Sequence, residues 1–281
     1  MPHEESANIV IRPLESSRDF EAFERLQREI WGVELQEVIT GSLAKIVQRI
    51  GGIAAGAFDA YDDLLGLVFG FTGYKNGNPM HWSHMLAVKA GARNLGLGRN
   101  LKVYQREILL RSGVKDVYWT YDPLVAKNAH LNFNLLGAEA DDYVEDMYGA
   151  GEDSVLFRGL GTDRFIVRWP IDSEKVRSAL ESKWVFGREP FVAAPLSVRR
   201  LNESDQFSDP ALNDCSESRQ FRVEIPSDIH VLRDHSVGLA ARWREATRAA
   251  FQLAYANSYQ VDGFYRDEAS DRCFYCLGKK G

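Results

Sequence analysis

The sequence contains few cysteines, three among 281 residues: Cys215, Cys273 and Cys276. A disulfide-rich secreted scaffold is therefore excluded, and a reducing cytoplasm is the expected compartment. Cys273 and Cys276 form a C-x-x-C pair, but no second pair completes the four ligands of a zinc site. The flanking residues alternate as in a strand, which sends the two thiols to opposite faces. We interpret both thiols as structural.

Long hydrophobic runs and an excess of positive charge are also absent. No run of about 18 apolar residues, the length that marks a membrane-spanning helix, occurs in the sequence. The formal net charge of −6 gives no electrostatic reason to expect nucleic acid or an anionic membrane as a partner. The first ten residues are polar and acidic, unlike a signal peptide. Hydrophobic residues make up 45% of the chain, which is typical of a globular protein.

The first 150 residues predict an α/β (α+β) fold with a mixed, mostly antiparallel central sheet flanked by helices. The expected order is strand, two helices, three strands, helix, strand, helix and strand. Ser16 or Ser17 is the expected N-cap of the first helix and Thr40 that of the second. Four apolar residues at helical spacing define the expected buried side of the second helix: Leu43, Ile46, Val47 and Ile50.

Beyond residue 149 the pattern changes to a smaller α/β half. Residues 163–171 alternate as a strand, and residues 201–220 are polar and rich in turn formers. A strand, a long helix near residues 237–256 and two further strands follow, in a partial echo of the first half. The expected buried face of the long helix comprises Leu239, Trp243, Thr247, Ala250, Phe251 and Ala254. We expect a first domain over residues 1–170 and a C-terminal extension over residues 171–281.

The stretch VKAGARNLGLGRNL, residues 88–101, places three glycines and two arginines between a predicted strand and a predicted helix. Amides at a helix start lack intrahelical acceptors, and glycines let an anion approach them. A P-loop would need lysine after Gly98, where Arg99 stands. The dinucleotide fingerprint would need a third glycine where Leu101 stands. The residues alone leave open a cradle for another phosphate compound or a simple turn.

Residues 93–98, RNLGLG, resemble motif A of the GNAT acyltransferase superfamily, [Q/R]-x-x-G-x-[G/A] between a strand and a helix. The preceding strand HMLAV and the element order of residues 8–149 are similar to the same family. The segments NAHLNFNLLGA and VEIPSDI…LAARWREATRAAF further resemble a bacterial group of predicted GNAT acetyltransferases with a C-terminal extension. The resemblance implies a GNAT-type fold, with the C-terminal half as a degenerate second GNAT-like unit.

The resemblance also implies an acyl-CoA cofactor, most often acetyl-CoA, bound without a metal. Backbone amides of residues 94–99 would hold the pyrophosphate, and residues 86–88 would pair with the pantetheine amides like an added strand. Asn128 corresponds to a position that commonly touches the pantetheine arm. The implied cofactor-binding residues are Leu86, Ala87, Val88, Arg93, Asn94, Leu95, Gly96, Leu97, Gly98, Arg99, Asn128 and Phe133.

His84 is the candidate general base. The sequence HWSHMLAV resembles the arylalkylamine acetyltransferase branch, where a histidine lies four positions before the valine that matches Val88. An imidazole titrates near physiological pH and suits this role. A half-buried strand histidine bonded to a carbonyl is the alternative. His81 is one residue out of step with the second histidine of that branch, so we expect it to point elsewhere.

The general acid departs from the family pattern. Many GNAT enzymes carry tyrosine four residues before the glycine that ends the second motif helix; here that glycine is Gly137 and the residue is Phe133. A phenyl ring has no proton to give. Either Tyr121 or Tyr148 protonates the leaving thiolate, or CoA leaves as the anion and takes its proton from water. By family analogy, a backbone amide near residues 86–88 stabilises the oxyanion.

The loop WGVELQEVIT between the first two helices is the expected acceptor site. Glu34 and Glu37 near Trp31 would suit a cationic amine, although a solvated charged loop is the alternative. The second half lacks another copy of motif A, so we expect one cofactor site per chain; this half would extend the sheet, cover the acceptor site or form a homodimer. The predicted function is acyl-CoA-dependent N-acyl transfer to a small amine. The alternative is a non-catalytic or regulatory acyl-CoA-binding protein.

Overall fold

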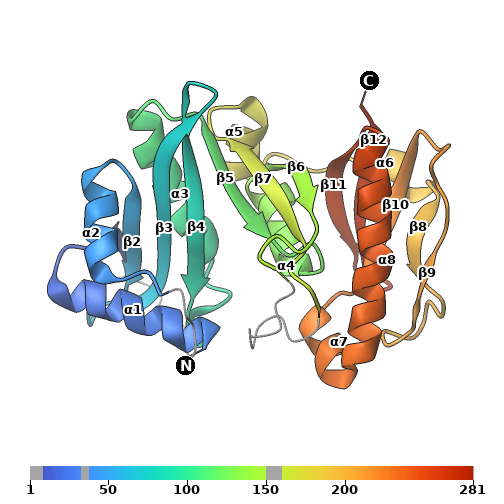
Figure 1. Cartoon of the computed structure of the whole chain (residues 1–281), viewed down its shortest axis with the longest axis horizontal. Coiled ribbons are helices and arrows are strands. Elements are labelled where there is room, and N and C mark those ends of the chain that lie inside the picture. The colour runs from blue at the N-terminus through green and yellow to red at the C-terminus, as the bar shows by residue number, and fades with distance from the viewer. Residues whose placement is uncertain (1–8, 33–37, 150–159, 281) are drawn as a thin grey trace. The chain divides into compact units, whose positions relative to one another are not determined.

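The computed structural model describes residues 9–32, 38–149 and 160–280, and Figure 1 labels their helices and strands. The chain divides into two compact units. The first unit comprises Met1–Trp119 and Pro170–Ser173, and the second comprises Thr120–Trp169 and Glu174–Gly281. The sequence analysis divided the chain by function, into a cofactor-binding domain over residues 1–170 and an extension over residues 171–281. That division stays a prediction.

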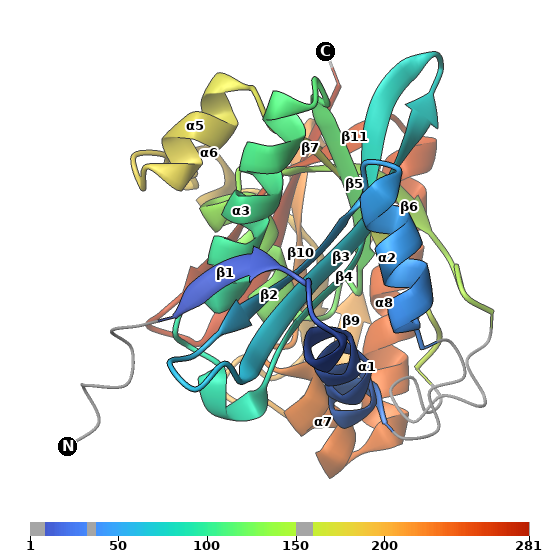
Figure 2. The same ribbon diagram turned by 90° about the vertical axis from the view of Figure 1, so that its left-hand side faces the viewer.

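The first unit is built on a meander of four antiparallel strands, which can be followed in Figure 2. The strands are β1 (Val10–Pro13), β2 (Ile53–Phe58), β3 (Leu64–Lys75) and β4 (Asn78–Val88), in that order across the sheet. β5 (Asp116–Tyr121) pairs with β4 in parallel. A parallel pair needs a crossover, which here contains the 3-10 helix η2 (Ala90–Ala92) and α3 (Leu97–Arg111).

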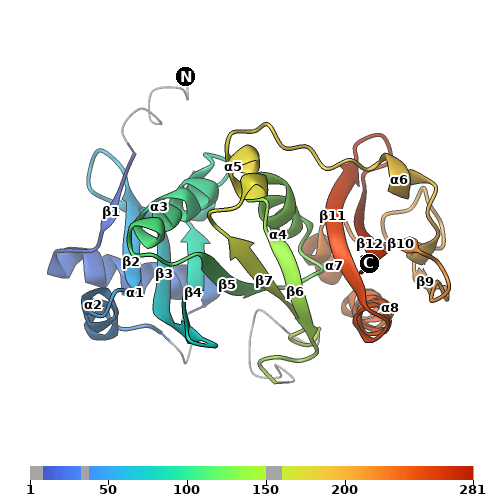
Figure 3. The same cartoon turned by 90° about the horizontal axis from the view of Figure 1, so that it is seen from above.

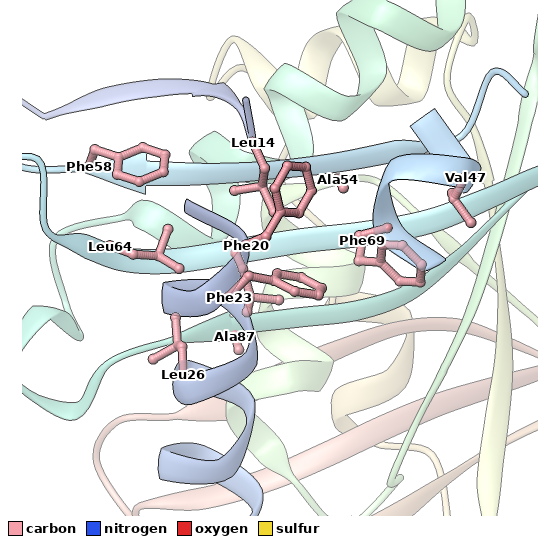
Figure 4. Packing of buried hydrophobic residues seen from close by; sticks show 12 residues of the cluster. Leu14, Phe20, Phe23, Leu26, Val47, Ala54, Phe58, Leu64, Phe69 and Ala87 are labelled. Atoms are coloured by element: carbon pink, nitrogen blue, oxygen red, sulfur yellow. The ribbon is translucent and has the colours of Figure 1, made fainter. Parts of the chain in front are cut away.

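Helix α1 (Ser17–Trp31) begins at a capping box. The Ser16 hydroxyl accepts a hydrogen bond from the backbone amide of Asp19, and the Asp19 carboxylate accepts one from the backbone amide of Ser16. This exchange satisfies two amides at the helix start. Phe20, Phe23 and Leu26 then turn into a buried cluster with residues of β2, β3 and β4 (Figure 4). The first helix is therefore held in place by both its cap and its apolar side.

The buried side predicted for helix α2 (Gly41–Arg49) is wrong for three of its four residues. Val47 is buried, whereas Leu43, Ile46 and Ile50 are 38%, 57% and 65% exposed. The spacing of apolar residues alone therefore predicted the wrong buried side for this helix.

Small residues decide which side of α2 is buried. Thr40 caps the helix as predicted, by accepting a hydrogen bond from the amide of Leu43. Gly41 and Ala44 then lie on the buried side, together with Val47. A Cβ atom at Gly41 would lie 2.8 Å from the Cβ of Phe20. The close approach of α2 to α1 therefore requires the side with the smallest residues.

In the second unit, β7 (Arg164–Pro170) pairs antiparallel with β6 (Glu139–Val144). The stretch AKNAHLNFNLLG, residues 126–137, predicts one α-helix. The structure instead has one turn of α-helix, α4 (Ala126–Ala129), followed directly by the π-helix η3 (His130–Leu135). The apolar pattern of so short a segment does not separate turns closed at i+4 from turns closed at i+5.

A second sheet completes this unit, in the order β11-β12-β10-β8-β9. Figure 3 shows β9, β10, β11 and β12 of this sheet with α8 beside them. The elements are α5 (Glu174–Leu180), α6 (Glu189–Val192), β8 (Leu196–Arg200), β9 (Pro210–Leu212), β10 (Gln220–Ile225), α7 (Ile229–His235), α8 (Val237–Ala256), β11 (Tyr259–Asp267) and β12 (Arg272–Lys279). All six residues predicted for the inner face of α8 are buried. The sequence missed α6, α7, β8 and β9, which are short. The fold class is confirmed: a mixed, mostly antiparallel sheet flanked by helices, with a second sheet in the C-terminal part.

The cysteine pair lies on β12, where both thiols are buried and free. Burial raises the pKa of the Cys273 thiol to about 12 and raises that of Cys276 as well. Among the residues that the structure describes, no group of His, Cys, Asp and Glu side chains could hold a metal ion. None of the described helices is long and apolar enough to cross a membrane.

Candidate functional site

The glycine loop connects β4 to α3 through two residues in the left-handed region. Asn94 has φ +72°, and Gly96, the N-cap of α3, has φ +72° and ψ 6°. Glycine adopts this conformation without strain and asparagine at modest cost, so both residues suit the turn. Leu97 anchors the helix start in the core, whereas Asn94, Leu95 and Gly96 are exposed.

The first turn of α3 forms an open cradle of backbone amides. The amide of Asn100 bonds to the carbonyl of Gly96 at 3.0 Å, which closes the first turn. The amides of Leu97 and Gly98 precede this bond, at a position where backbone amides lack an acceptor within the helix. A Cβ atom at Gly98 would meet only the Cδ2 of Leu86, at 3.9 Å. The helix of 15 residues adds the positive end of its dipole. These residues fit an anion such as a pyrophosphate.

Strand β4 loses its β5 neighbour before it reaches this loop. Its pairing with β3 continues to Val88, opposite Gly66. Its described pairing with β5 ends at Trp82, opposite Tyr118. The amide of Lys89 bonds to the carbonyl of Leu65, so the alternation of an antiparallel ladder turns the amides of Leu86 and Val88 away from β3. Those two residues can pair with an extended ligand, whereas the amide of Ala87, the third predicted residue, faces β3.

A β-bulge lies at His84. Phe69 pairs with Met85 and Gly70 pairs with Ser83, so His84 is the extra residue of β4. A bulge reorients the side chains that follow it and is common beside active sites. The His84 ring is exposed, with centroid distances of 5.7 Å to Phe71 and 6.3 Å to Phe69. The candidate base is thus displayed at an irregularity that the sequence did not reveal.

The two candidate acids lie in the second unit and differ in availability. Tyr121 is buried, and burial raises its pKa well above the ordinary value. Tyr275 donates its hydroxyl proton to the carbonyl of Pro123 at 2.7 Å. In the 3.1 Å contact between the two phenols, the proton must therefore come from Tyr121. Tyr148 is 53% exposed, and its hydroxyl lies 2.9 Å from the Thr120 hydroxyl. Tyr148 is the more accessible proton donor.

The remaining predicted residues of the second unit have different surroundings. Asn128 is exposed on α4. Phe133 is buried in η3, with its ring edge-on to Tyr275 at 6.0 Å. A side chain in this position packs the core of its unit, so a contact of Phe133 with a cofactor stays a prediction.

The predicted acceptor loop is only partly described. Trp31 ends α1 and packs, half-buried, against the core cluster. Glu34 and Glu37 lie outside the described residues. The role of this loop in acceptor binding therefore stays a prediction.

The sequence missed a buried polar chain between β4 and α3. The Nζ of Lys102 donates to the Ser83 hydroxyl at 2.8 Å and to the Gln105 Oε1 at 3.2 Å. The Nε2 of Gln105 lies 3.0 Å from the Nε2 of His81, and the Nδ1 of His81 lies 2.9 Å from the Thr72 hydroxyl. The Lys102 Nζ also lies 3.6 Å from the centroid of the Trp119 ring.

Burial lowers the pKa of both basic side chains in this hydrogen-bonded network. It lowers the pKa of His81 to about 3, with a smaller contribution from Lys102. It lowers the pKa of Lys102 well below the ordinary value of a lysine. One signal was available in the sequence: Gln105 interrupts the i, i+4 row Leu97, Leu101, Leu109 that faces the core. A polar residue in such a row needs buried partners.

No protein-family model and no curated protein matches the chain. Solved structures are similar over somewhat more than half of it. The NatC complex bound to Gag peptide and CoA includes a chain that is 16% identical with a TM-score of 0.46, over 58% of this chain and 98% of that one. An aminoglycoside 6'-N-acetyltransferase complexed with coenzyme A is 14% identical with a TM-score of 0.44, over 59% and 98%. The ribosomal-protein-S18-alanine N-acetyltransferase from Escherichia coli is 17% identical with a TM-score of 0.44, over 59% and 95%.

The element order in the first part of the chain is the one that the sequence resemblance implied. One strand, two helices and three antiparallel strands lead to the glycine loop, α3 and a parallel strand. The first part of the chain therefore has the arrangement expected of a GNAT-type fold.

Proposed function

We propose that the protein is an acyl-CoA-dependent N-acyltransferase that transfers an acyl group, with acetyl-CoA as the donor, to a small amine. One observation carries the proposal: a free strand edge and an anion cradle follow each other along β4. The strand leaves β5 after Trp82, and its end leads into the amide cradle at the start of α3. This series suits a ligand with an extended amide chain that ends in a pyrophosphate, which is the chemistry of CoA.

The binding groups belong to the first unit. The amides of Leu86 and Val88 would pair with the pantetheine amides, since they point away from β3. The amides of residues 97–99 would hold the pyrophosphate, and Arg93 and Arg99 would add positive charge. None of these roles requires a metal ion.

His84 would carry the acid–base chemistry of the first step. Bound acyl-CoA would supply a thioester whose carbonyl carbon an amine can attack. As the C–N bond forms and the C–S bond breaks, His84 would accept the proton that the amine loses. The amide of Leu86 or Val88 would donate a hydrogen bond to the carbonyl oxygen. The thiolate would take its proton from Tyr148 or from water.

A second candidate function is non-catalytic acyl-CoA binding. Two observations favour it: Phe133 stands where many GNAT enzymes have tyrosine, and the proton of Tyr121 is engaged by Tyr275. Both functions share the cradle, so binding and turnover must be tested separately.

Calorimetric titration with acetyl-CoA tests the shared binding site. Gly98→Asp places a carboxylate in the cradle, where only Leu86 lies within 4 Å of the new Cβ. It should weaken binding on the order of tenfold or more without unfolding the chain, because the carboxylate repels the diphosphate. Gly91→Asp is the matched control: its Cβ meets nothing within 4 Å, and it lies in η2 before the cradle. Equal affinity in all three proteins would contradict the cradle.

Release of the CoA thiol across a panel of amines separates the two functions. Turnover that falls in His84→Gln, with the acetyl-CoA Kd unchanged, supports the transferase and His84 as base. Saturable binding without thiol release for any amine supports the non-catalytic function. Unchanged turnover in His84→Gln would assign the base elsewhere.

A further inference from the structure

The buried chain between α3 and β4 has one direction, because each hydroxyl has one proton to donate. The Thr72 hydroxyl donates to the carbonyl of Gly51 at 2.6 Å. It must therefore accept from the Nδ1–H of His81. The Nε2 of His81 then accepts from Gln105, whose Oε1 accepts from Lys102. The donors run from the lysine on the helix, through the neutral imidazole of β4, to the backbone carbonyl of Gly51.

The hydrogen-bonded network reaches the residue next to the bulge. Lys102 holds Ser83, the residue immediately before His84, and Gln105 holds His81. Both β4 residues therefore face α3. After the bulge, Met85 and Ala87 pack instead with the cluster of α1 and α2.

Strand alternation would place residues 81, 83, 85 and 87 on one face. The extra residue His84 is what lets the first two face α3 and the last two face the opposite cluster. Without the bulge, either Ser83 would lose its lysine or Met85 would leave the apolar core. The polar chain and the apolar cluster therefore hold the bulge from its two sides.

Gly70 provides the room for this arrangement. It pairs with Ser83, and a Cβ atom there would lie 2.3 Å from the His81 Nε2 and 2.5 Å from the carbonyl oxygen of Trp82. The imidazole of His81 occupies the space that a side chain at Gly70 would need.

We propose that Lys102 is a positioning residue for His84: by holding Ser83 on the α3 face, it fixes the bulge that displays the His84 ring. The consequence for acyl transfer rests on the proposed function. The placement of the His84 ring is independent of the proposed function, and it can be measured without following turnover. Because α3 also carries the amide cradle at its start, the same contact aligns the cradle with the strand that leads to it.

Lys102→Met removes the donor and keeps a long unbranched side chain. Carbon–proton NMR of the histidine rings, with the His84 signal assigned from its loss in His84→Gln, is the direct measurement. We expect the His84 ring signal to shift or broaden in Lys102→Met. The control is Leu109→Ala, which leaves a cavity beside the same helix but removes no member of the hydrogen-bonded network. In this control, the His84 signal should stay as in the wild type.

Steady-state kinetics give the second readout. In Lys102→Met, kcat should fall by about 10-fold to 100-fold, the usual effect of a small misplacement of a reacting group. The KM for acyl-CoA should change less than kcat. If the lower kcat of Lys102→Met came only from a loss of folded protein, Leu109→Ala would show an equal fall in apparent kcat at the same loss of stability.

A His84 signal unchanged in folded Lys102→Met would overturn the proposal. If that variant fails to fold, Ser83→Ala removes the acceptor on β4 and should move the same signal to a smaller extent; an unmoved signal there has the same meaning. If no amine is acylated, the transferase proposal fails, while the NMR result still decides the positioning role.

Discussion

The two units bury charged side chains in opposite ways. In the first unit, Lys102 is 2% exposed, and its described hydrogen bonds go to a hydroxyl and an amide. In the second unit, Glu224 is fully buried between Arg200 and Arg272, with nitrogen–oxygen distances of 2.7 Å and 2.8 Å. In the second arrangement, each of the three buried charges lies against an opposite charge. Burial of Lys102 instead lowers the pKa of its amine well below the ordinary value of a lysine.

A second ionic cluster follows the same rule as the first. Asp163 is fully buried and accepts from Arg248 at 2.6 Å and from the Tyr143 hydroxyl. These bonds hold the pKa of Asp163 below its usual value against the opposing effect of burial. The buried hydrogen-bonded network of the first unit lies beside the bulge and the candidate base, which is why we assign the positioning role to it.

Removing the carboxylate of Glu224 should give the largest effect. Glu224→Gln takes the described counter-charge from the buried guanidinium of Arg200 and leaves Arg272 with only the exposed Glu203, so the free energy of unfolding should fall by about 3–5 kcal/mol. Urea unfolding measures the loss. The matched control is Glu203→Gln, because Glu203 pairs with the same Arg272 at 3.1 Å but is 65% exposed. That change should cost about 0–1 kcal/mol. Equal losses would show that burial does not set the strength of these pairs.

Filling the space of the His81 ring should have an intermediate effect. Gly70→Ala places a methyl group 2.3 Å from the His81 Nε2, so the ring or the strand must move at a cost of about 1–3 kcal/mol. Gly73→Ala is the control on the same strand, since its Cβ would meet nothing within 4 Å. Thermal unfolding compares the two. A stable Gly70→Ala with an unmoved His84 ring signal would contradict the tight packing around the polar chain.

Acidification should lower the stability of the protein through His81. The pKa of His81 is about 3 in the folded protein and near 6.5 in the unfolded chain. Between these values the unfolded state binds the additional proton, so stability is lost as the pH falls below 6.5. The slope contributed by His81 is at most about 1.4 kcal/mol per pH unit. Urea unfolding between pH 6.5 and pH 5 should show a smaller slope in His81→Gln than in the wild type. Identical slopes would mean that His81 is not held neutral.

Local signals in the sequence predicted local structure well. The caps at Ser16 and Thr40 were found because a side-chain acceptor and the amides that it satisfies lie within a few residues. The inner face of α8 was found because a helix of 20 residues repeats its apolar stripe many times. The glycine loop could be recognised because positive φ angles and a helix start need particular residues at neighbouring positions.

Features that depend on distant neighbours were not predictable in the same way. The buried side of α2 depends on how closely Gly41 approaches Phe20, which no spacing within α2 records. The bulge at His84 depends on the register of β3, where Phe69 and Gly70 pair with residues two apart. The state of Tyr121 depends on a hydroxyl 154 positions away along the chain.

The sequence by itself determined the element order of the first 149 residues, the caps and a glycine loop suited to an anion, because each depends on residues adjacent along the chain. Only the tertiary structure decided where β4 is bulged, which of its amides are left unpaired by β5, and which residue of α3 it contacts. Pairing with β3 creates the bulge, the end of pairing with β5 frees the amides of Leu86 and Val88, and contact with α3 supplies the lysine that holds Ser83. Each of these results from strands and a helix meeting across the fold, and apolar spacing along one segment carries no record of such meetings.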